Sequence, residues 1–222
     1  MIRGIIFDMD GTILNTIEDI KTSVNHAMNY FGLKEKTLQE VKDAVGRGAI
    51  NLIEDVVPKE TSKEDILKIY EVYQKHYDTY ANQQTGPYPG ILDLLKKLKA
   101  KGYKLAVVSN KLEYLVNELN HQTFKDYFDV SIGETDGIPI KPAPDMLYKA
   151  LDLLKLNKEE VLFIGDSDID MLTATNAHIK SVGVTWGYRS KEVLIKYQAA
   201  YIINKADELL HIIDEVNTHG ND

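Results

Sequence analysis

The stretch IIFDMDGT, residues 5–12, decides the fold of this chain. Its first three residues form a short apolar run that is typical of the end of a buried strand, and Asp8 and Asp10 follow where that strand would leave the sheet. Side chains two positions apart leave a strand on the same side, so both carboxylates can face one pocket while Gly11 lets the backbone turn sharply. Open α/β sheets bind ligands at the carboxyl ends of their strands, so the stretch predicts reaction chemistry. A plain turn also favours Asp and Gly, and the rest of the chain has to decide between the two interpretations.

Composition narrows the class of protein. The 222 residues, 44% of them hydrophobic, suffice for one large domain or for a domain that carries an insertion. A formal net charge of -8, from 26 basic and 34 acidic residues, argues against nucleic acid as a partner. The chain has no cysteine, which excludes disulfides and thiol catalysis, and its six histidines show no metal-ligand spacing. With neither a signal peptide pattern nor an apolar run of membrane-spanning length, we expect a cytoplasmic protein that does not bind membranes.

Hydrophobic periodicity divides the chain into two parts. Residues 16–82 show helical patterns, with helix-start signals at Thr37 and Ser62. Downstream of them predicted helices and strands alternate, which implies a mainly parallel sheet with helices on both faces. We therefore predict an α/β core made of residues 1–15 and 83–222, and an all-helical insertion that covers the C-terminal edge of the sheet. The expected strands span 3–8, 104–108, 128–132, 161–164, 180–184 and 200–203, and the expected helices of the core span 91–100, 113–121, 144–155, 168–177 and 205–216.

Three further polar segments follow predicted strands. They are Ser109-Asn110-Lys111 after 104–108, Lys141-Pro142 after 128–132, and GDSDID, residues 165–170, after 161–164. Each alone has a plainer explanation, as a helix cap or as a solvated loop lysine. A parallel sheet brings all of these strand ends to one edge, however, and in combination they are specific.

The aspartates at this edge require a cation. They are Asp8, Asp10, Asp166 and Asp170. Four crowded carboxylates are unfavourable unless positive charge compensates them, and carboxylates with waters and substrate oxygens are the ligands that Mg²⁺ prefers. We therefore predict Mg²⁺ as the cofactor and these four residues as the metal site. Lys141 can balance part of the remaining charge and the Ser109 hydroxyl can donate to a phosphoryl oxygen, which together make a site for phosphoryl transfer.

The chain resembles the haloacid dehalogenase-like hydrolase superfamily over nearly its whole length. The four motifs of that superfamily match DMDGT at 8–12, Ser109, Lys141 and GDSDID at 165–170. The resemblance implies a Rossmann-like core with a helical cap of the C1 type inserted after the first motif, where the periodicity places residues 16–82.

The resemblance also implies the roles of the two leading aspartates. Asp8 is the nucleophile that forms an aspartyl-phosphate. Asp10 is the acid and base, and its backbone carbonyl also reaches Mg²⁺. The dehalogenase branch lacks the second aspartate and needs no metal, so Asp10 argues for a phosphatase.

The remaining matched residues hold the metal and the phosphoryl group. The resemblance makes Asp166 a metal ligand, and Asp170 either a metal ligand or a carboxylate that holds Lys141. Ser109 and Lys141 clamp the phosphoryl group.

Within the superfamily the chain looks most like phosphoglycolate phosphatases and their close phosphatase relatives. The residues that carry this likeness are PYPG at 87–90, Ser109-Asn110-Lys111, KPAP at 141–144 and GVTWGYRS at 183–190. We expect a monomeric or homodimeric enzyme that acts on a small phosphorylated metabolite.

Selectivity is expected to lie in the helical cap. Arg47 is the candidate for contacting the far end of the substrate, because a guanidinium recognises carboxylate or phosphate in a fork and its flanking glycines let the loop approach. A solvated loop arginine is the equally weighted alternative. Thr12 and Asn110 complete the predicted substrate-binding residues.

Three alternatives stay open. A pyrophosphatase or a phosphomutase related to β-phosphoglucomutase would share the aspartyl-phosphate chemistry. A receiver-like signalling module would use clustered aspartates, Mg²⁺, a hydroxyl and a lysine, but it needs neither a leaving-group acid such as Asp10 nor an inserted lid.

Overall fold

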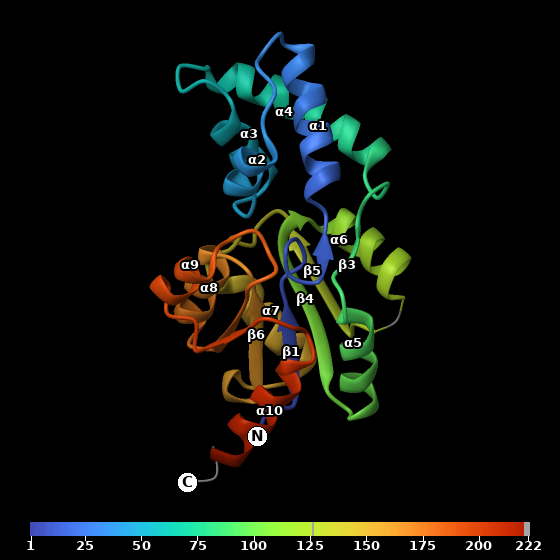
Figure 1. The fold of residues 1–222 in the computed structure, drawn as a ribbon, viewed down its shortest axis with the longest axis vertical. Coiled ribbons are helices and arrows are strands. Elements are labelled where there is room, and N and C mark those ends of the chain that lie inside the picture. Colours follow the sequence, from blue (N-terminus) through green and yellow to red (C-terminus); the bar gives the residue numbers. More distant parts are fainter. Residues whose placement is uncertain (126, 220–222) are drawn as a thin grey trace.

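The computed structural model describes residues 1–125 and 127–219 (Figure 1). Its main sheet has six parallel strands in the order β5-β4-β1-β6-β7-β8. These strands are β1 (Gly4–Phe7), β4 (Lys104–Leu112), β5 (Val130–Glu134), β6 (Val161–Gly165), β7 (Lys180–Val184) and β8 (Tyr201–Ile203). The helices that pack around the sheet are α5 (Ile91–Ala100), α6 (Glu113–Leu119), α7 (Asp145–Leu154), α8 (Asp168–Ala177), α9 (Lys191–Lys196) and α10 (Glu208–His219). The predicted Rossmann-like α/β fold is confirmed.

Strand β1 lies inside the sheet because all of its side chains are apolar and buried. It pairs with β4 on one side and β6 on the other. Its alternate side chains serve opposite faces: Ile5 and Phe7 belong to a core cluster with residues of α5, α6 and α10, and Ile6 belongs to a second cluster with residues of α7 and α8. Helices therefore cover both faces of the sheet. Asp8 follows the carboxyl end of β1 and so lies at the edge of the sheet where the parallel strands end.

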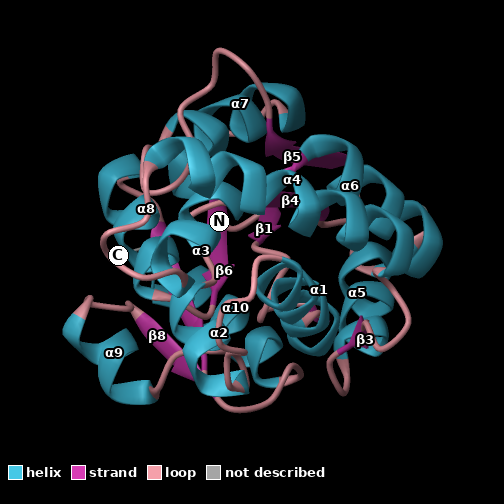
Figure 2. Cartoon of the chain, turned by 90° about the horizontal axis from the view of Figure 1, so that it is seen from above, coloured by secondary structure: helices cyan, strands magenta, loops and turns pink. Residues whose placement is uncertain are grey.

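The first four helices of the chain form a separate layer. They are α1 (Ile17–Tyr30), α2 (Leu38–Ala44), α3 (Ala49–Val56) and α4 (Lys63–Tyr80), and they share a third hydrophobic cluster. Figures 1 and 2 show this layer above the carboxyl ends of the strands. The two chain segments that connect it to the core pair with each other as a short antiparallel sheet of β2 (Leu14–Asn15) and β3 (Gly86–Pro87). None of the helices described in the structure is long and apolar enough to cross a membrane.

Some elements differ from the sequence-based expectation. Strand β4 continues to Leu112, four residues beyond the predicted end, because its register against β5 shifts after Val108 and pairing resumes at Leu112. The short strands β2 and β3 were not predicted, since two residues are too few to show a period. Helix α9 and a five-residue π-helical turn at Asn120–Phe124 were also missed. The predicted boundaries of the other core elements lie within three residues of those observed.

The packing of α5 on the sheet gives a test of the core. Leu95 on α5 is completely buried, whereas Leu92 on the same helix is 42% exposed. We expect Leu95→Ala to lower the free energy of unfolding by about 2–5 kcal/mol, because it leaves a cavity under the sheet. The matched Leu92→Ala variant should change it by less than about 0.5 kcal/mol. Urea unfolding followed by circular dichroism measures both, and equal losses would contradict the packing described here.

Candidate active site

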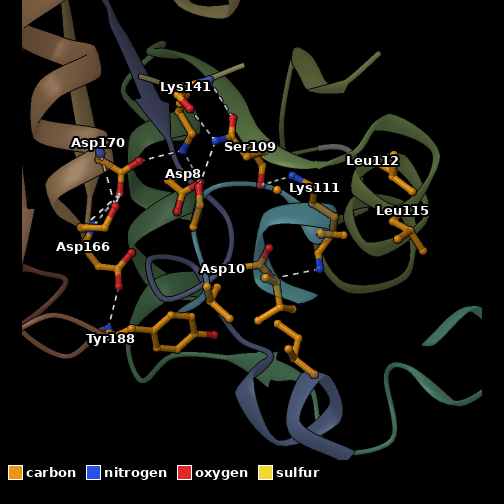
Figure 3. A pocket seen from close by; sticks show the side chains of 18 of the residues that line it. Asp8, Asp10, Ser109, Lys111, Leu112, Leu115, Lys141, Asp166, Asp170 and Tyr188 are labelled. Carbon is orange, nitrogen blue, oxygen red and sulfur yellow. Dashed lines mark hydrogen bonds and ion pairs between the residues drawn. The ribbon is translucent and has the colours of Figure 1, made fainter. Parts of the chain in front are cut away.

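The predicted strand ends converge on one cavity of about 60 Å³ between the sheet edge and the helical layer. Its core side carries polar and charged groups, which include Asp8, Asp10, Ser109, Lys111, Lys141 and Asp170. Its other side is mostly apolar and is lined from the helical layer by residues such as Ile20, Ala49, Leu52, Tyr73 and Tyr77. The cavity therefore joins an apolar roof to a charged floor, whose side chains Figure 3 shows.

A buried ion-pair cluster lies on the cavity floor. The Lys141 ammonium is 2.7 Å from a carboxylate oxygen of Asp8 and 2.7 Å from one of Asp170. Burial, and then the neighbouring Asp170, raise the pKa of Asp8 well above its usual value in spite of Lys141. Burial alone would lower the pKa of Lys141, but the carboxylates of Asp170 and Asp8 raise it above its usual value. The cluster thus holds Lys141 as a cation between two carboxylates.

Helix α8 positions Asp170 through its own N-terminus. Ser167 is the N-cap, and its hydroxyl donates to Asp170 Oδ2 at 2.7 Å. The backbone N–H groups of Asp166 and Ser167 donate to the same oxygen. Because that oxygen is fully engaged, the other oxygen of Asp170 is left for Lys141.

Asp166 is held by the segment that follows β7. The backbone N–H of Tyr188 donates to Asp166 Oδ2 at 2.6 Å. Two glycines make this approach possible, since a Cβ on Gly11 would lie 2.4 Å from Asp166 Oδ2 and one on Gly187 would lie 2.2 Å from its Cβ. Burial and the charge of Asp170 raise the pKa of Asp166. The position of Asp166 therefore requires glycine at both 11 and 187, because a side chain at either position would collide with it.

The three buried carboxylates fit a metal ion. Single oxygens of Asp8, Asp166 and Asp170 all lie within 4.8 Å of one another. Burial raises the pKa of Asp8 and of Asp166, and the neighbouring charge of Asp170 adds to both shifts, so three carboxylates are crowded here around the single ammonium of Lys141. A hard divalent cation with oxygen ligands would relieve that excess, so the donor set can hold one. Three of the four aspartates predicted as the metal site thus form a cluster that could hold a metal, and Asp10 is not a member of this cluster.

Asp10 lies in the same cavity with a different set of partners. The Thr16 hydroxyl donates to Asp10 Oδ1 at 2.6 Å, and the Lys111 ammonium lies 3.3 Å from the same oxygen. Figure 3 shows Asp10 facing Lys111 and Asp8 facing Lys141. The two aspartates therefore share a cavity but belong to separate charge pairs, which suits separate chemical roles.

Ser109 and Asn110 are adjacent near the carboxyl end of β4 and have different hydrogen-bond partners. The Ser109 oxygen accepts a hydrogen bond from the backbone N–H of Lys111, which leaves its O–H free to donate into the cavity. The Asn110 amide donates both of its N–H groups, to the backbone carbonyls of Lys141 and Gly46, and it accepts from the Lys141 N–H at 2.8 Å. With both donors taken, Asn110 positions Lys141 and tethers the helical layer. It also lines the cavity, and its contact with a substrate stays a prediction.

The structure places the other two predicted substrate-binding residues away from the cavity. Thr12 is fully buried and its hydroxyl approaches Asp166 Oδ1 at 3.4 Å, so it orients that carboxylate. The Arg47 guanidinium is half exposed, does not line the cavity, and pairs with Asp55 of α3. Its neighbours Gly46 and Gly48 line the cavity instead. Neither Thr12 nor Arg47 lines the cavity in this arrangement, and contact of either with a substrate stays a prediction.

Sequence reasoning missed three residues around the site. They are Lys111, Tyr188 and Arg189. The Tyr188 hydroxyl bonds to Thr16, and the Arg189 guanidinium donates to carbonyls at the end of α2, including that of Val45 at 2.8 Å. All three fall inside segments that carry the likeness to phosphoglycolate phosphatases. Lys111 lies at the irregular end of β4, and Tyr188 and Arg189 lie in the loop after β7, so no period indicates the directions of their side chains.

The family model described as haloacid dehalogenase-like hydrolase matches residues 5–184. The chain belongs to the haloacid dehalogenase-like hydrolases. It is 36% identical over 187 residues to a phosphoglycolate phosphatase from Aquifex aeolicus, covering 84% of this chain and 86% of that protein. It is 29% identical over 219 residues to the pyrophosphatase PpaX from Bacillus mycoides, covering 97% and 99% of the two chains. A crystal structure of a predicted phosphoglycolate phosphatase from Haemophilus somnus superposes with a TM-score of 0.89 at 27% identity, covering 96% and 98%.

These similarities confirm the predicted family and the predicted kind of enzyme. The haloacid dehalogenase-like motifs lie within the matched residues, and the similar proteins are phosphatases by name. A hydrolase of the phosphatase type, similar to phosphoglycolate phosphatases, is therefore the correct class for this chain.

The glycine beside Asp166 gives a test of the site geometry. A Cβ on Gly187 would also lie 2.5 Å from the backbone oxygen of Gly11, so Gly187→Ala forces Asp166 or the backbone to move. We expect a loss of about 1–3 kcal/mol in the free energy of unfolding, as for other overpacked sites. We also expect a smaller rise in melting temperature when divalent cations are titrated. Gly86→Ala is the matched control because a Cβ there meets open space, and an unchanged cation response in Gly187→Ala would refute the placement of Asp166.

Proposed function

We propose that this protein is a Mg²⁺-dependent phosphatase that hydrolyses a small phosphate monoester through an aspartyl-phosphate on Asp8. One observation carries the proposal. The buried carboxylate of Asp8 lies 2.7 Å from the Lys141 ammonium, in a cluster of three carboxylates that can hold a cation, and it shares its cavity with Asp10. The similarity to phosphatases of the same family supports it.

Asp8 is the proposed nucleophile. A carboxylate oxygen of Asp8 attacks phosphorus and the bond to the leaving oxygen breaks, and water then attacks phosphorus of the aspartyl-phosphate to release phosphate and restore the carboxylate. Lys141 offsets negative charge on the phosphoryl oxygens in both steps, and the Ser109 hydroxyl donates to one of them.

Asp10 is the proposed acid and base. It gives a proton to the leaving oxygen in the first step and takes one from the attacking water in the second. The hydrogen bond from Thr16 and the ion pair with Lys111 fix the carboxylate so that it faces the cavity.

The proposed metal ligands are Asp8, Asp166 and the backbone carbonyl of Asp10, and Asp170 lies beside them. When bound, Mg²⁺ would neutralise charge on the phosphoryl group. One oxygen of Asp170 accepts hydrogen bonds from Ser167 and backbone N–H groups, and the other contacts Lys141. We therefore assign Asp170 to holding Lys141 beside the metal.

Residues 16–82 are the proposed cap, and 1–15 with 83–222 the proposed core. Helices α1–α4 supply most of one hydrophobic cluster, in which Leu115 and Tyr188 of the core also take part, and they supply the apolar roof of the cavity. The pairing of β2 with β3 provides a narrow connection about which the cap can open and close, so that water is excluded during the reaction. The cytoplasmic location and the monomeric or homodimeric state stay predictions from the sequence.

Phosphoglycolate is the first candidate substrate and pyrophosphate the second. The former rests on the 36% identity to a phosphoglycolate phosphatase, and the latter on the PpaX pyrophosphatase, with which the chain aligns over 97% of its length. The cavity of about 60 Å³ favours small substrates of either kind.

A phosphate-release panel tests the proposed function. It compares phosphoglycolate, pyrophosphate, sugar phosphates and nucleoside monophosphates, each with Mg²⁺ and with excess chelator. We expect many turnovers per chain, kcat/KM highest for one of the two small substrates, and loss of activity when the metal is removed. A single turnover per chain would favour the receiver-like alternative, and transfer to a sugar hydroxyl would favour the phosphomutase.

The nucleophile is tested by Asp8→Asn. We expect kcat to fall by at least roughly 1,000-fold, because the amide cannot form the acyl phosphate and losses of nucleophiles in other enzymes are of this size or larger. Melting temperature and circular dichroism should show a folded protein. Asp152→Asn, at an exposed position of α7, is the matched control and should retain full activity. Near-normal hydrolysis by Asp8→Asn would contradict the proposed mechanism.

A further inference from the structure

Lys111 is a buried cation of the cavity that the proposed mechanism does not fully use. It lies two residues beyond Ser109 on β4, and its side chain is only 8% exposed. Its ammonium donates to the hydroxyl of Tyr77 on cap helix α4 at 2.9 Å and lies 3.3 Å from Asp10 Oδ1 (Figure 3). The cation therefore stands between the proposed acid and the cap.

The Lys111 ammonium and the Tyr77 hydroxyl each have one hydrogen-bond donor without an acceptor among the described residues. A lysine ammonium carries three N–H donors, and in the described part of the chain its partners are Tyr77 and Asp10 alone. The Tyr77 hydroxyl accepts from Lys111, and within residues 1–125 and 127–219 no acceptor is found for its own hydrogen. Both groups line the cavity, so two unspent donors lie together beside Asp10.

The other cations that line the cavity are already engaged. Lys141 contacts the carboxylates of both Asp8 and Asp170. Arg189 pairs with Asp168 and donates to backbone carbonyls at the end of α2. Among the described residues, Lys111 is thus the cavity cation with most capacity for an additional anion.

The position of Lys111 matches the chemistry of a small substrate that carries two anionic groups. The leaving oxygen has to lie beside Asp10, which protonates it. In phosphoglycolate the carboxylate carbon is two bonds from that oxygen, and in pyrophosphate the second phosphorus is bonded to it directly. A second anionic group so close to the leaving oxygen falls next to the residue that is paired with Asp10. Apolar neighbours such as Leu112 and Leu115 line this part of the cavity and strengthen charge pairing there.

We infer that Lys111 and the Tyr77 hydroxyl form a second anion site, which selects phosphate esters and anhydrides whose leaving group carries a carboxylate or phosphate within two bonds of the scissile oxygen. The inference rests on the proposed phosphatase function and names its substrate class. It makes Lys111 a specificity residue that contacts substrate, and Tyr77 the means by which cap closure completes the site.

Two substrates of equal length test the inference. Phosphoglycolate and 2-hydroxyethyl phosphate have the same scissile bond and a two-carbon leaving group, but only the first carries a carboxylate. We expect the wild type to prefer phosphoglycolate in kcat/KM, and Lys111→Met to reduce that preference about 100-fold, as for loss of one partner of a desolvated charge pair. The ratio of the two substrates cancels any effect on Asp10 that both substrates feel. Lys99→Met is the matched control, because Lys99 pairs with Asp129 outside the cavity and its loss should leave the ratio unchanged.

The outcomes separate the inference from the function on which it rests. If the wild type hydrolyses none of phosphoglycolate, 2-hydroxyethyl phosphate and pyrophosphate, the result counts against the proposed function. Turnover of both with no preference, or a preference that survives Lys111→Met, overturns the second anion site and leaves the phosphatase intact. If Lys111→Met does not fold, Tyr77→Phe decides: it removes one donor and keeps the ring, so the preference should fall about 3- to 10-fold, and an unchanged preference overturns the inference.

Discussion

The site depends on the buried contact of one ammonium, that of Lys141, with two carboxylates, those of Asp8 and Asp170. Taking these charges out of water is costly, and removal of either sign would leave the other uncompensated. The contact is therefore possible only because the backbone around it is held. Asn110 holds the backbone of Lys141, and the N-terminus of α8 holds Asp170.

The same residues connect the charge cluster to the helical layer above it. Asn110 donates to the Gly46 carbonyl as well as to Lys141, and Arg189 donates to the carbonyls of Asp43 and Val45 at the end of α2. Tyr188 holds Asp166 through its N–H. Contact with the helical layer and assembly of the charged floor therefore involve shared groups, so each arrangement stabilises the other.

The two sides of the cavity have opposite polarity for a physical reason. The floor is made of strand ends, where polar side chains and backbone groups are left after the sheet pairs. The roof is made of helices, whose apolar faces pack on one another and extend to the cavity wall. An apolar roof over a charged floor lowers the local dielectric and strengthens every charge contact beneath it.

The sequence by itself determined the fold class, the separate helical segment and the identity of the charged floor. Those predictions depended on period and order: an apolar strand points its last residue at a sheet edge, and parallel strands bring their carboxyl ends together. Only the tertiary structure decided how side chains in loops and at the irregular end of β4 are used. The Asn110 amide donates to backbone carbonyls, Arg47 pairs with Asp55, and Lys111 lines the cavity. Loops have no repeating geometry, and the register of β4 shifts between Val108 and Leu112. Side-chain directions at such positions follow from partners that lie far away in the sequence, such as Tyr77 of the helical layer for Lys111.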